Sequence, residues 1–157
     1  FAGYILLHII GARYIYSYVP YNKWYGAVIG LFTDPPVYVS ESRNGYDRFV
    51  HFAYGILLFP YIYEVLGYKR TIDKRMLIIL VWAIMQSVSM VYEIFEWGLT
   101  LALSPEAAND YNGQQGDMWD AQKDMFLAML GSTIMAGIYL FSPVAEFLKR
   151  KEKIGLD

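Results

Sequence analysis

Long uncharged stretches separated by short polar segments dominate the pattern of this chain. The longest covers 21 residues (125–145), and two others cover 17 residues (76–92) and 15 residues (49–63). A helix needs roughly 20 mostly apolar residues to cross the hydrocarbon core of a bilayer, so each stretch is long enough once its flanks are included. The alternation that membrane barrels require is missing. The pattern therefore predicts an all-α fold, a polytopic integral membrane helix bundle.

We expect about four transmembrane helices, at residues 1–19, 46–68, 74–103 and 119–151. The third should stop before Pro105, and Pro143 should bend the fourth. The apolar stretch at 24–32 is too short to cross, and Trp24 and Tyr25 at its start predict one short interfacial helix. Residues 1–157 thus form a single membrane domain. Because the chain begins without methionine, we expect it to lack N-terminal residues of a longer protein.

Composition agrees with this assignment, since 56% of the residues are hydrophobic and only 18% are charged. The absence of cysteine excludes disulfide and thiol chemistry. No basic stripe indicates nucleic acid as a partner. The lipid bilayer is the expected partner, with other membrane subunits as an open alternative. A small-residue face on the fourth helix (Gly131, Ser132, Ala136, Gly137) predicts close helix packing.

The distribution of basic residues predicts the orientation. If the last three predicted helices alternate in direction, eight basic residues lie on one side, in the turn at 69–75 and in the tail at 149–153. Four others lie on the opposite side (Lys23, Arg43, Arg48, Lys123). By the positive-inside rule, we expect a multi-pass membrane protein with a cytoplasmic C-terminus.

Ionisable side chains gather at the opposite ends of these three helices, where membrane proteins use them for function by default. Asp47, Glu96 and Asp124 lie 21, 21 and 25 residues from the basic ends of their helices. At 1.5 Å per residue, 21 residues cover about 32 Å, which brings all three acids to one depth near the outer surface. The full candidate set is Asp47, His51, Glu93, Glu96, Asp117, Asp120 and Asp124.

Within this set the spacings place neighbours on one helix face. Asp47 and His51 (i, i+4) could bind a metal together or orient the imidazole, although helix-dipole stabilisation of Asp47 with a hydrogen-bonded His51 explains that pair, taken alone, slightly better. Glu93 and Glu96 (i, i+3) oppose the dipole at a helix C-terminus, which favours a cation or a shared proton over the alternative of two hydrated acids at a helix end.

The third group follows an i, i+3, i+7 pattern at the start of the last helix. Capping accounts for Asp117, but it explains Asp120 poorly and Asp124 hardly at all. Lys123 could neutralise one of these acids, and Arg13 is another candidate counter-charge.

An acid-rich cluster with one imidazole predicts a divalent cation such as Mg²⁺, Ca²⁺, Mn²⁺ or Fe²⁺, held by the seven residues of the set. Whether the protein is an enzyme is left open. If it is one, metal-dependent hydrolysis of a lipid-linked or phosphate-bearing substrate fits best, with Asp47, His51 and Glu93 as candidate catalytic groups. Two alternatives are an ion or proton transporter and a non-catalytic accessory subunit of a larger complex. His8, in an apolar segment, is expected to be a hydrogen-bonded packing residue.

Four stretches of the chain carry a resemblance to a known family: GARYIYSYVPY, NGYDRFVHFAYG, YEIFEW and GQQGDMWDAQKDMFLAMLGS. They resemble the YjdF-like bacterial inner-membrane proteins, a family of unknown function whose members usually carry additional N-terminal helices. The chain departs from the family at Arg13, where the resemblance implies a histidine, and this weakens the inference of a metal site. More distantly, the starts of two helices are similar to VanZ-like membrane proteins, which implies no established activity.

Overall fold

The computed structural model describes residues 1–33, 43–68, 70–104 and 115–141 of the chain. All regular structure in these residues is helical, in the order α1 (Ala2–Arg13), η1 (Tyr16–Tyr18, a 3₁₀ turn), α2 (Tyr21–Ile29), α3 (Tyr46–Gly67), α4 (Lys74–Ala102) and α6 (Asp120–Phe141). Helices α3, α4 and α6 are long and apolar enough to cross a membrane, and α1 is a shorter apolar helix. The predicted all-α helix bundle is confirmed.

Helix boundaries agree with the predicted ones where polar residues flank an apolar run. Helices α3 and α4 each end one residue before the predicted limit, and α6 begins one residue after it. The Asp73 carboxylate caps α4 by accepting the backbone N–H groups of Arg75 (2.9 Å) and Met76 (3.2 Å). The predicted stop of the third helix before Pro105 is confirmed, because α4 ends at Ala102 and Leu103 is extended. The predicted end of the fourth helix at residue 151 and its bend at Pro143 fall outside the described part of the chain.

The first helix is shorter than predicted, so its expected extent of 1–19 is wrong. Helix α1 ends at Arg13, and the chain turns through Ile15, whose φ of 49° lies in the left-handed region. The Asn44 side chain stabilises this turn by donating hydrogen bonds to the carbonyl oxygens of Ser17 (2.9 Å) and Val19 (2.6 Å). This contact comes from a residue distant in sequence, so the local apolar pattern gave no sign of it.

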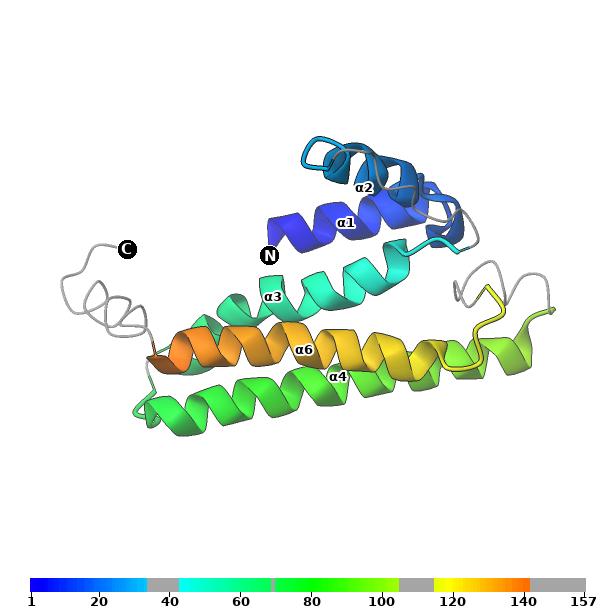
Figure 1. The fold of residues 1–157 in the computed structure, drawn as a ribbon. Helices are drawn as coiled ribbons and strands as arrows, with labels where there is room; N and C mark the ends of the chain where they lie inside the picture. Colours follow the sequence, from blue (N-terminus) through cyan, green and yellow to red (C-terminus); the bar gives the residue numbers. More distant parts are fainter. Residues whose placement is uncertain (34–42, 69, 105–114, 142–157) are drawn as a thin grey trace.

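The α3–α6 contact is the closest in the bundle because two glycines meet there. A Cβ atom added at Gly55 would lie 2.5 Å from the carbonyl oxygen of Ala128, and one added at Gly131 would collide with the Phe52 carbonyl oxygen. Such close backbone approach is typical of small residues in membrane helices. Helix α6 also contacts α4 through the Gln86–Ser132 hydrogen bond (2.9 Å). As Figure 1 shows, α6 lies between α3 and α4, while α1 and α2 lie on the far side of α3.

Apolar and polar residues occupy different levels of the bundle. A buried cluster that includes Phe59, Val81 and Met85 fills the level between the basic turn and the middle of the helices. The outer face of α4 is apolar and exposed, as at Ile79 (59%) and Val91 (60%), which is the surface expected to meet lipid. At the other end a second, smaller buried cluster of Val19, Tyr46 and Val50 packs between α1 and α3, and the polar side chains gather beside it.

Candidate functional site

Three helix ends bring the predicted polar residues together. The start of α3, the end of α4 and the start of α6 lie at the same end of the bundle (Figure 1). Six of the seven predicted site residues are buried there, at 2–8% exposure. These six are Asp47, His51, Glu93, Glu96, Asp120 and Asp124. The seventh, Asp117, is partly exposed at the edge.

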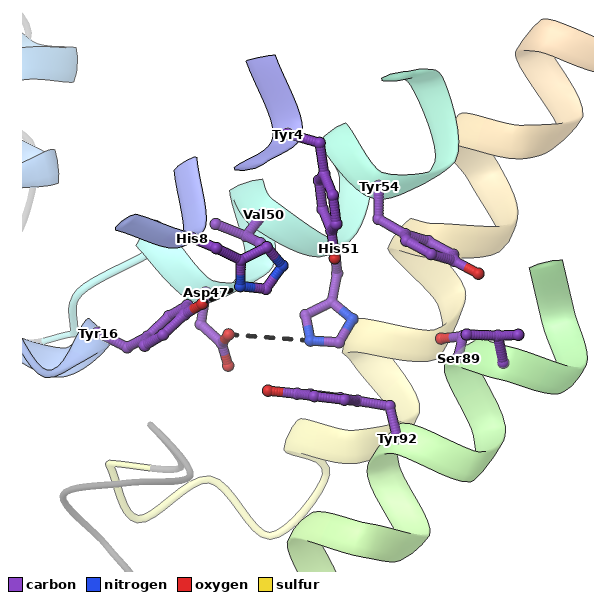
Figure 2. Close-up of a pocket in the computed structure, with 10 residues that line it drawn as sticks. Tyr4, His8, Tyr16, Asp47, Val50, His51, Tyr54, Ser89 and Tyr92 are labelled. Atoms are coloured by element: carbon purple, nitrogen blue, oxygen red, sulfur yellow. Dashed lines mark hydrogen bonds and ion pairs between the residues drawn. The ribbon is translucent and has the colours of Figure 1, made fainter. Parts of the chain in front are cut away.

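The inner part of the site is built around the His51 imidazole. Its Nε2 atom lies 3.5 Å from Glu93 Oε1 and 3.8 Å from Asp47 Oδ1. Asp47, His51 and Asp124 each offer a ligand atom, and these three atoms lie within 4.8 Å of one another. Figure 2 shows the Asp47 carboxylate facing the His51 ring. Three helices thus supply one compact set of oxygen and nitrogen donors.

Two oxygen atoms of this inner part have no hydrogen-bond partner. Glu93 Oε1 and Asp124 Oδ1 are both fully buried, and neither accepts a hydrogen bond from the described residues. A buried polar atom without a partner costs free energy, and a carboxylate oxygen costs more than a neutral one. Glu96 differs, because the Tyr92 hydroxyl donates a hydrogen bond to its carboxylate. Glu93 and Asp124 thus each have a carboxylate oxygen without a hydrogen-bond donor among the described residues, whereas the Glu96 carboxylate has such a donor.

The outer part of the site is a network of ion pairs. Asp120 binds the guanidinium of Arg43 and lies 3.6 Å from Arg48 Nη2. Asp117 binds Arg48 and also Lys123, whose Nζ lies 2.6 Å from Asp117 Oδ2. The expected pairing of Lys123 with an acid is confirmed. Asp117 and Asp120 are thus neutralised by side chains of the protein itself.

Asp117 also shapes the entry to α6. Its Oδ1 accepts the backbone N–H of Trp119 at 3.0 Å. The hydrogen bond from Lys123 and the one from Trp119 hold the pKa of the Asp117 carboxyl well below its usual range. This residue therefore stays ionised, and a structural role accounts for all its contacts.

The charges in the site do not balance. Six carboxylates face three basic side chains, Arg43, Arg48 and Lys123, among the described residues. All three basic residues lie in the outer part, so the excess negative charge falls on Asp47, Glu93, Glu96 and Asp124. Buried charge of this kind requires a positive partner or protonation.

The counter-charges are not all the expected ones. Arg13 is exposed, and its guanidinium lies 5.8 Å from the centre of the Tyr14 ring instead of in the acid cluster, so the prediction for Arg13 is wrong. Arg43 was not assigned to the site from the sequence, although it binds Asp120. A loop residue separated from its partner by 77 positions leaves no periodic signal.

Two hollows flank the inner acids. A cavity of about 60 Å³ lies between α1, α3 and α4 and has Asp47 and His51 in its wall. On the other side, a groove of about 350 Å³ runs between α4 and α6 and has Glu93, Glu96 and Asp120 in its wall. The apolar walls of the groove include Met90 and Trp97, which are 49% and 63% exposed on the lipid-facing side of α4.

Comparison with known proteins yields one family and one close relative. The family described as "Predicted membrane protein (DUF2238)" matches residues 1–143. The chain is 35% identical over 135 residues to the inner membrane protein YjdF of Escherichia coli K12, an alignment that covers 82% of this chain and 58% of the relative. The chain thus spans less than two thirds of the length of that relative. No solved structure matches.

Proposed function

The chain belongs to the DUF2238 family of predicted membrane proteins, and we propose that the inner acids of its buried site bind a divalent cation. Two oxygens without a hydrogen-bond donor among the described residues, Glu93 Oε1 and Asp124 Oδ1, are the observation that carries the proposal. They lie beside a set of ligand atoms from Asp47, His51 and Asp124 that are within 4.8 Å of one another. A cation would give these oxygens the partner that the described residues do not supply.

The donor set indicates which cations fit. Asp47, Glu93 and Asp124 offer carboxylate oxygens, and His51 offers one imidazole nitrogen. Oxygen-rich sites with one imidazole suit Mg²⁺, Mn²⁺, Ca²⁺ or Fe²⁺ better than a structural zinc, which favours thiolate and several histidines. Glu96 completes the set from the next turn of α4. Asp117 and Asp120, both predicted as ligands, are better explained as partners of Arg43 and Arg48.

Metal-assisted hydrolysis is the reaction that this arrangement supports best. A divalent cation supplies polarisation of an ester or phosphoryl oxygen when it is bound. The His51 imidazole is placed to accept a proton, and Asp47, whose Oδ1 lies 3.8 Å from Nε2, would orient it. Glu93 Oε1 lies 3.5 Å from the same ring nitrogen.

The groove favours a lipid-linked or phosphate-bearing substrate. Its floor carries the acids, while Met90 and Trp97 form walls that continue into the lipid-facing surface of α4. An amphiphile could therefore present its polar head to the acids while its apolar part stays in the membrane. Such access from the side requires no aqueous path through the bundle.

The polar residues deeper in the bundle support a site at one end over a transport path. Gln86 donates hydrogen bonds to Ser132 Oγ and to the Trp82 carbonyl. Ser87 bonds to the Ala83 carbonyl within its own helix. These polar groups pair with the protein instead of lining a continuous channel. We accordingly favour a binding site over a transporter.

We further propose that the protein lies in the bacterial inner membrane with its C-terminus in the cytoplasm. The relative YjdF is an inner membrane protein. The excess of basic residues in the turn before α4 and in the C-terminal tail supports this orientation. The acid site then opens near the periplasmic surface.

Metal content of the purified protein tests the proposal. We expect stoichiometric Mn²⁺ or Mg²⁺ after dialysis against the ion, and about tenfold weaker binding or worse for Glu93→Gln and Asp124→Asn. Glu64→Gln is the matched control, because Glu64 is an exposed acid on α3 that no site residue contacts in the described structure. Wild type that binds no divalent ion would refute the proposal. Unchanged binding by both variants would show that other residues hold the ion.

A further inference from the structure

The cavity between α1, α3 and α4 has a wall unlike that of the acid cluster beside it. Aromatic and imidazole rings supply most of the lining, from Tyr4, His8, Tyr16, His51, Tyr54 and Tyr92. Its volume of about 60 Å³ is well above the roughly 10–15 Å³ that one water needs. The cavity can therefore hold a small molecule.

Neighbouring rings in this wall meet at steep angles. Tyr4 and His8 are inclined at 85°, and His51 and Tyr92 at 61°. Tyr16 lies at 63° to His8 and its hydroxyl hydrogen-bonds the His8 Nδ1 atom. These ring pairs therefore meet edge to face and are not stacked. Figure 2 shows these side chains converging from three helices and η1.

The charge of the wall is negative. Asp47 is its one carboxylate, and neither lysine nor arginine contributes to it among the described residues. The adjacent Arg48 binds Asp117 in the outer network. An anion would find no counter-charge here. The wall also carries the hydroxyl of Ser89, a residue that is 5% exposed and whose Oγ has no hydrogen-bond partner among the described residues.

We propose that this cavity binds the ammonium group of a small organic amine. Ring faces around a carboxylate attract alkylammonium ions through cation–π and charge interactions, as aromatic cages do for quaternary amines. Ser89 Oγ is available to a hydroxyl or N–H of the ligand. An inorganic divalent ion fits the acid cluster better, because the ring wall offers it few oxygen ligands. The amine site goes beyond the proposed metal site but shares Asp47 and His51 with it, so a bound divalent ion would compete with the ammonium for the Asp47 carboxylate.

The ammonium could belong to a free amine or to a lipid headgroup, so the test separates the two. Protein in nanodiscs of phosphatidylglycerol, which has no ammonium, is titrated with choline by calorimetry in the presence of EDTA. The probe 3,3-dimethylbutan-1-ol is the neutral counterpart of choline with nearly the same shape. We expect saturable choline binding that exceeds binding of the neutral alcohol by about tenfold or more.

Variants locate the site. Tyr4→Leu should weaken choline binding about tenfold, whereas Tyr4→Phe keeps the ring and should keep the affinity. Tyr61→Leu is the control, since Tyr61 is an exposed tyrosine of α3 that is not part of the cavity wall. Even if Tyr4→Leu fails to fold, the comparison of choline with the neutral alcohol on the wild-type protein tests the proposal.

The outcomes are distinct. Weaker apparent choline binding in phosphatidylcholine nanodiscs than in phosphatidylglycerol nanodiscs would identify the lipid headgroup as the competing ligand, and equal binding would favour a free amine. Equal affinity for choline and the neutral alcohol, or no saturable binding, would overturn the proposal. Because EDTA is present throughout, failure of the metal site would leave this result unaffected.

Discussion

At the scale of single residues, two aspartates one turn apart on α6 have opposite surroundings. Asp120 is bound by Arg43 and lies close to Arg48, whereas Asp124 Oδ1 is buried without a partner. The same substitution should therefore have different effects at the two positions. Removing the Asp120 charge takes away the carboxylate that Arg43 binds, while removing the Asp124 charge relieves a buried negative excess.

We predict that Arg43 and Asp120 are energetically coupled. In a double-mutant cycle of Arg43→Gln and Asp120→Asn, the unfolding free energy in detergent should show a coupling of about 1–3 kcal/mol, because the contact is largely buried. The pair Arg43→Gln and Glu64→Gln serves as control and should be additive, since Glu64 lies towards the opposite end of α3. A coupling near zero for Arg43 and Asp120 would mean that the ion pair does not form in solution.

We also predict how Asp117 contributes to stability as pH changes. Because hydrogen bonds from Lys123 and Trp119 lower the pKa of Asp117 in the folded protein, its contribution is fully present above the unfolded pKa of about 3.9 and is lost as the pH falls through the folded value. Asp117→Asn should thus lower Tm equally at pH 5 and pH 8, and the difference should narrow only below about pH 4. If the Tm difference between the wild type and Asp117→Asn already became smaller between pH 8 and pH 5, the lowered pKa of Asp117 would be contradicted.

At the scale of helices, the α3–α6 contact holds the site together. Helix α3 carries Asp47 and His51, and α6 carries Asp124. The two helices touch at Gly55 and Gly131, only a few turns from these side chains, where no side chain separates the backbones. Any change that separates the helices should separate the donors as well.

We predict that Gly131→Ala destabilises the protein by about 1–3 kcal/mol and weakens divalent-ion binding, because its new Cβ would collide with the backbone of α3. Gly137→Ala is the matched control on the same helix. A Cβ there meets nothing within 4 Å, so this variant should be neutral or slightly more stable. Thermal unfolding and metal titration measure the two effects. Equal behaviour of the two variants would rule out the close contact.

The same helices show what the sequence can and cannot predict. Uninterrupted apolar runs bounded by polar residues predicted both ends of α3 and α4 and the start of α6 to within one residue. The predicted small-residue face is confirmed only in part, because Gly131 and Ser132 are buried whereas a Cβ at Gly137 would meet nothing within 4 Å. The early end of α1 was not predicted, because the Asn44 side chain that stabilises the turn at η1 lies in a different segment.

At the scale of the whole molecule, the common depth of the acids followed from counting residues along three helices of alternating direction. That reasoning placed Asp47, Glu96 and Asp124 together, as the structure does. It could not divide the cluster into an inner and an outer part, because this depends on Arg43 reaching Asp120 from a loop. The cavity lined by aromatic rings could not be predicted from the sequence either, because its residues come from three helices and η1 and share no motif.

Our last prediction concerns the orientation of the bundle. Since the chain contains no cysteine, single cysteines give an unambiguous label. Met118→Cys, at a position 83% exposed beside the acid site, should react with a membrane-impermeant maleimide in intact cells. Thr71→Cys, exposed in the turn before α4, should react only after the membrane is permeabilised, and Ile84→Cys within α4 should stay unlabelled as the control. The reverse pattern would place the acid site on the cytoplasmic face, where a periplasmic substrate could not reach it.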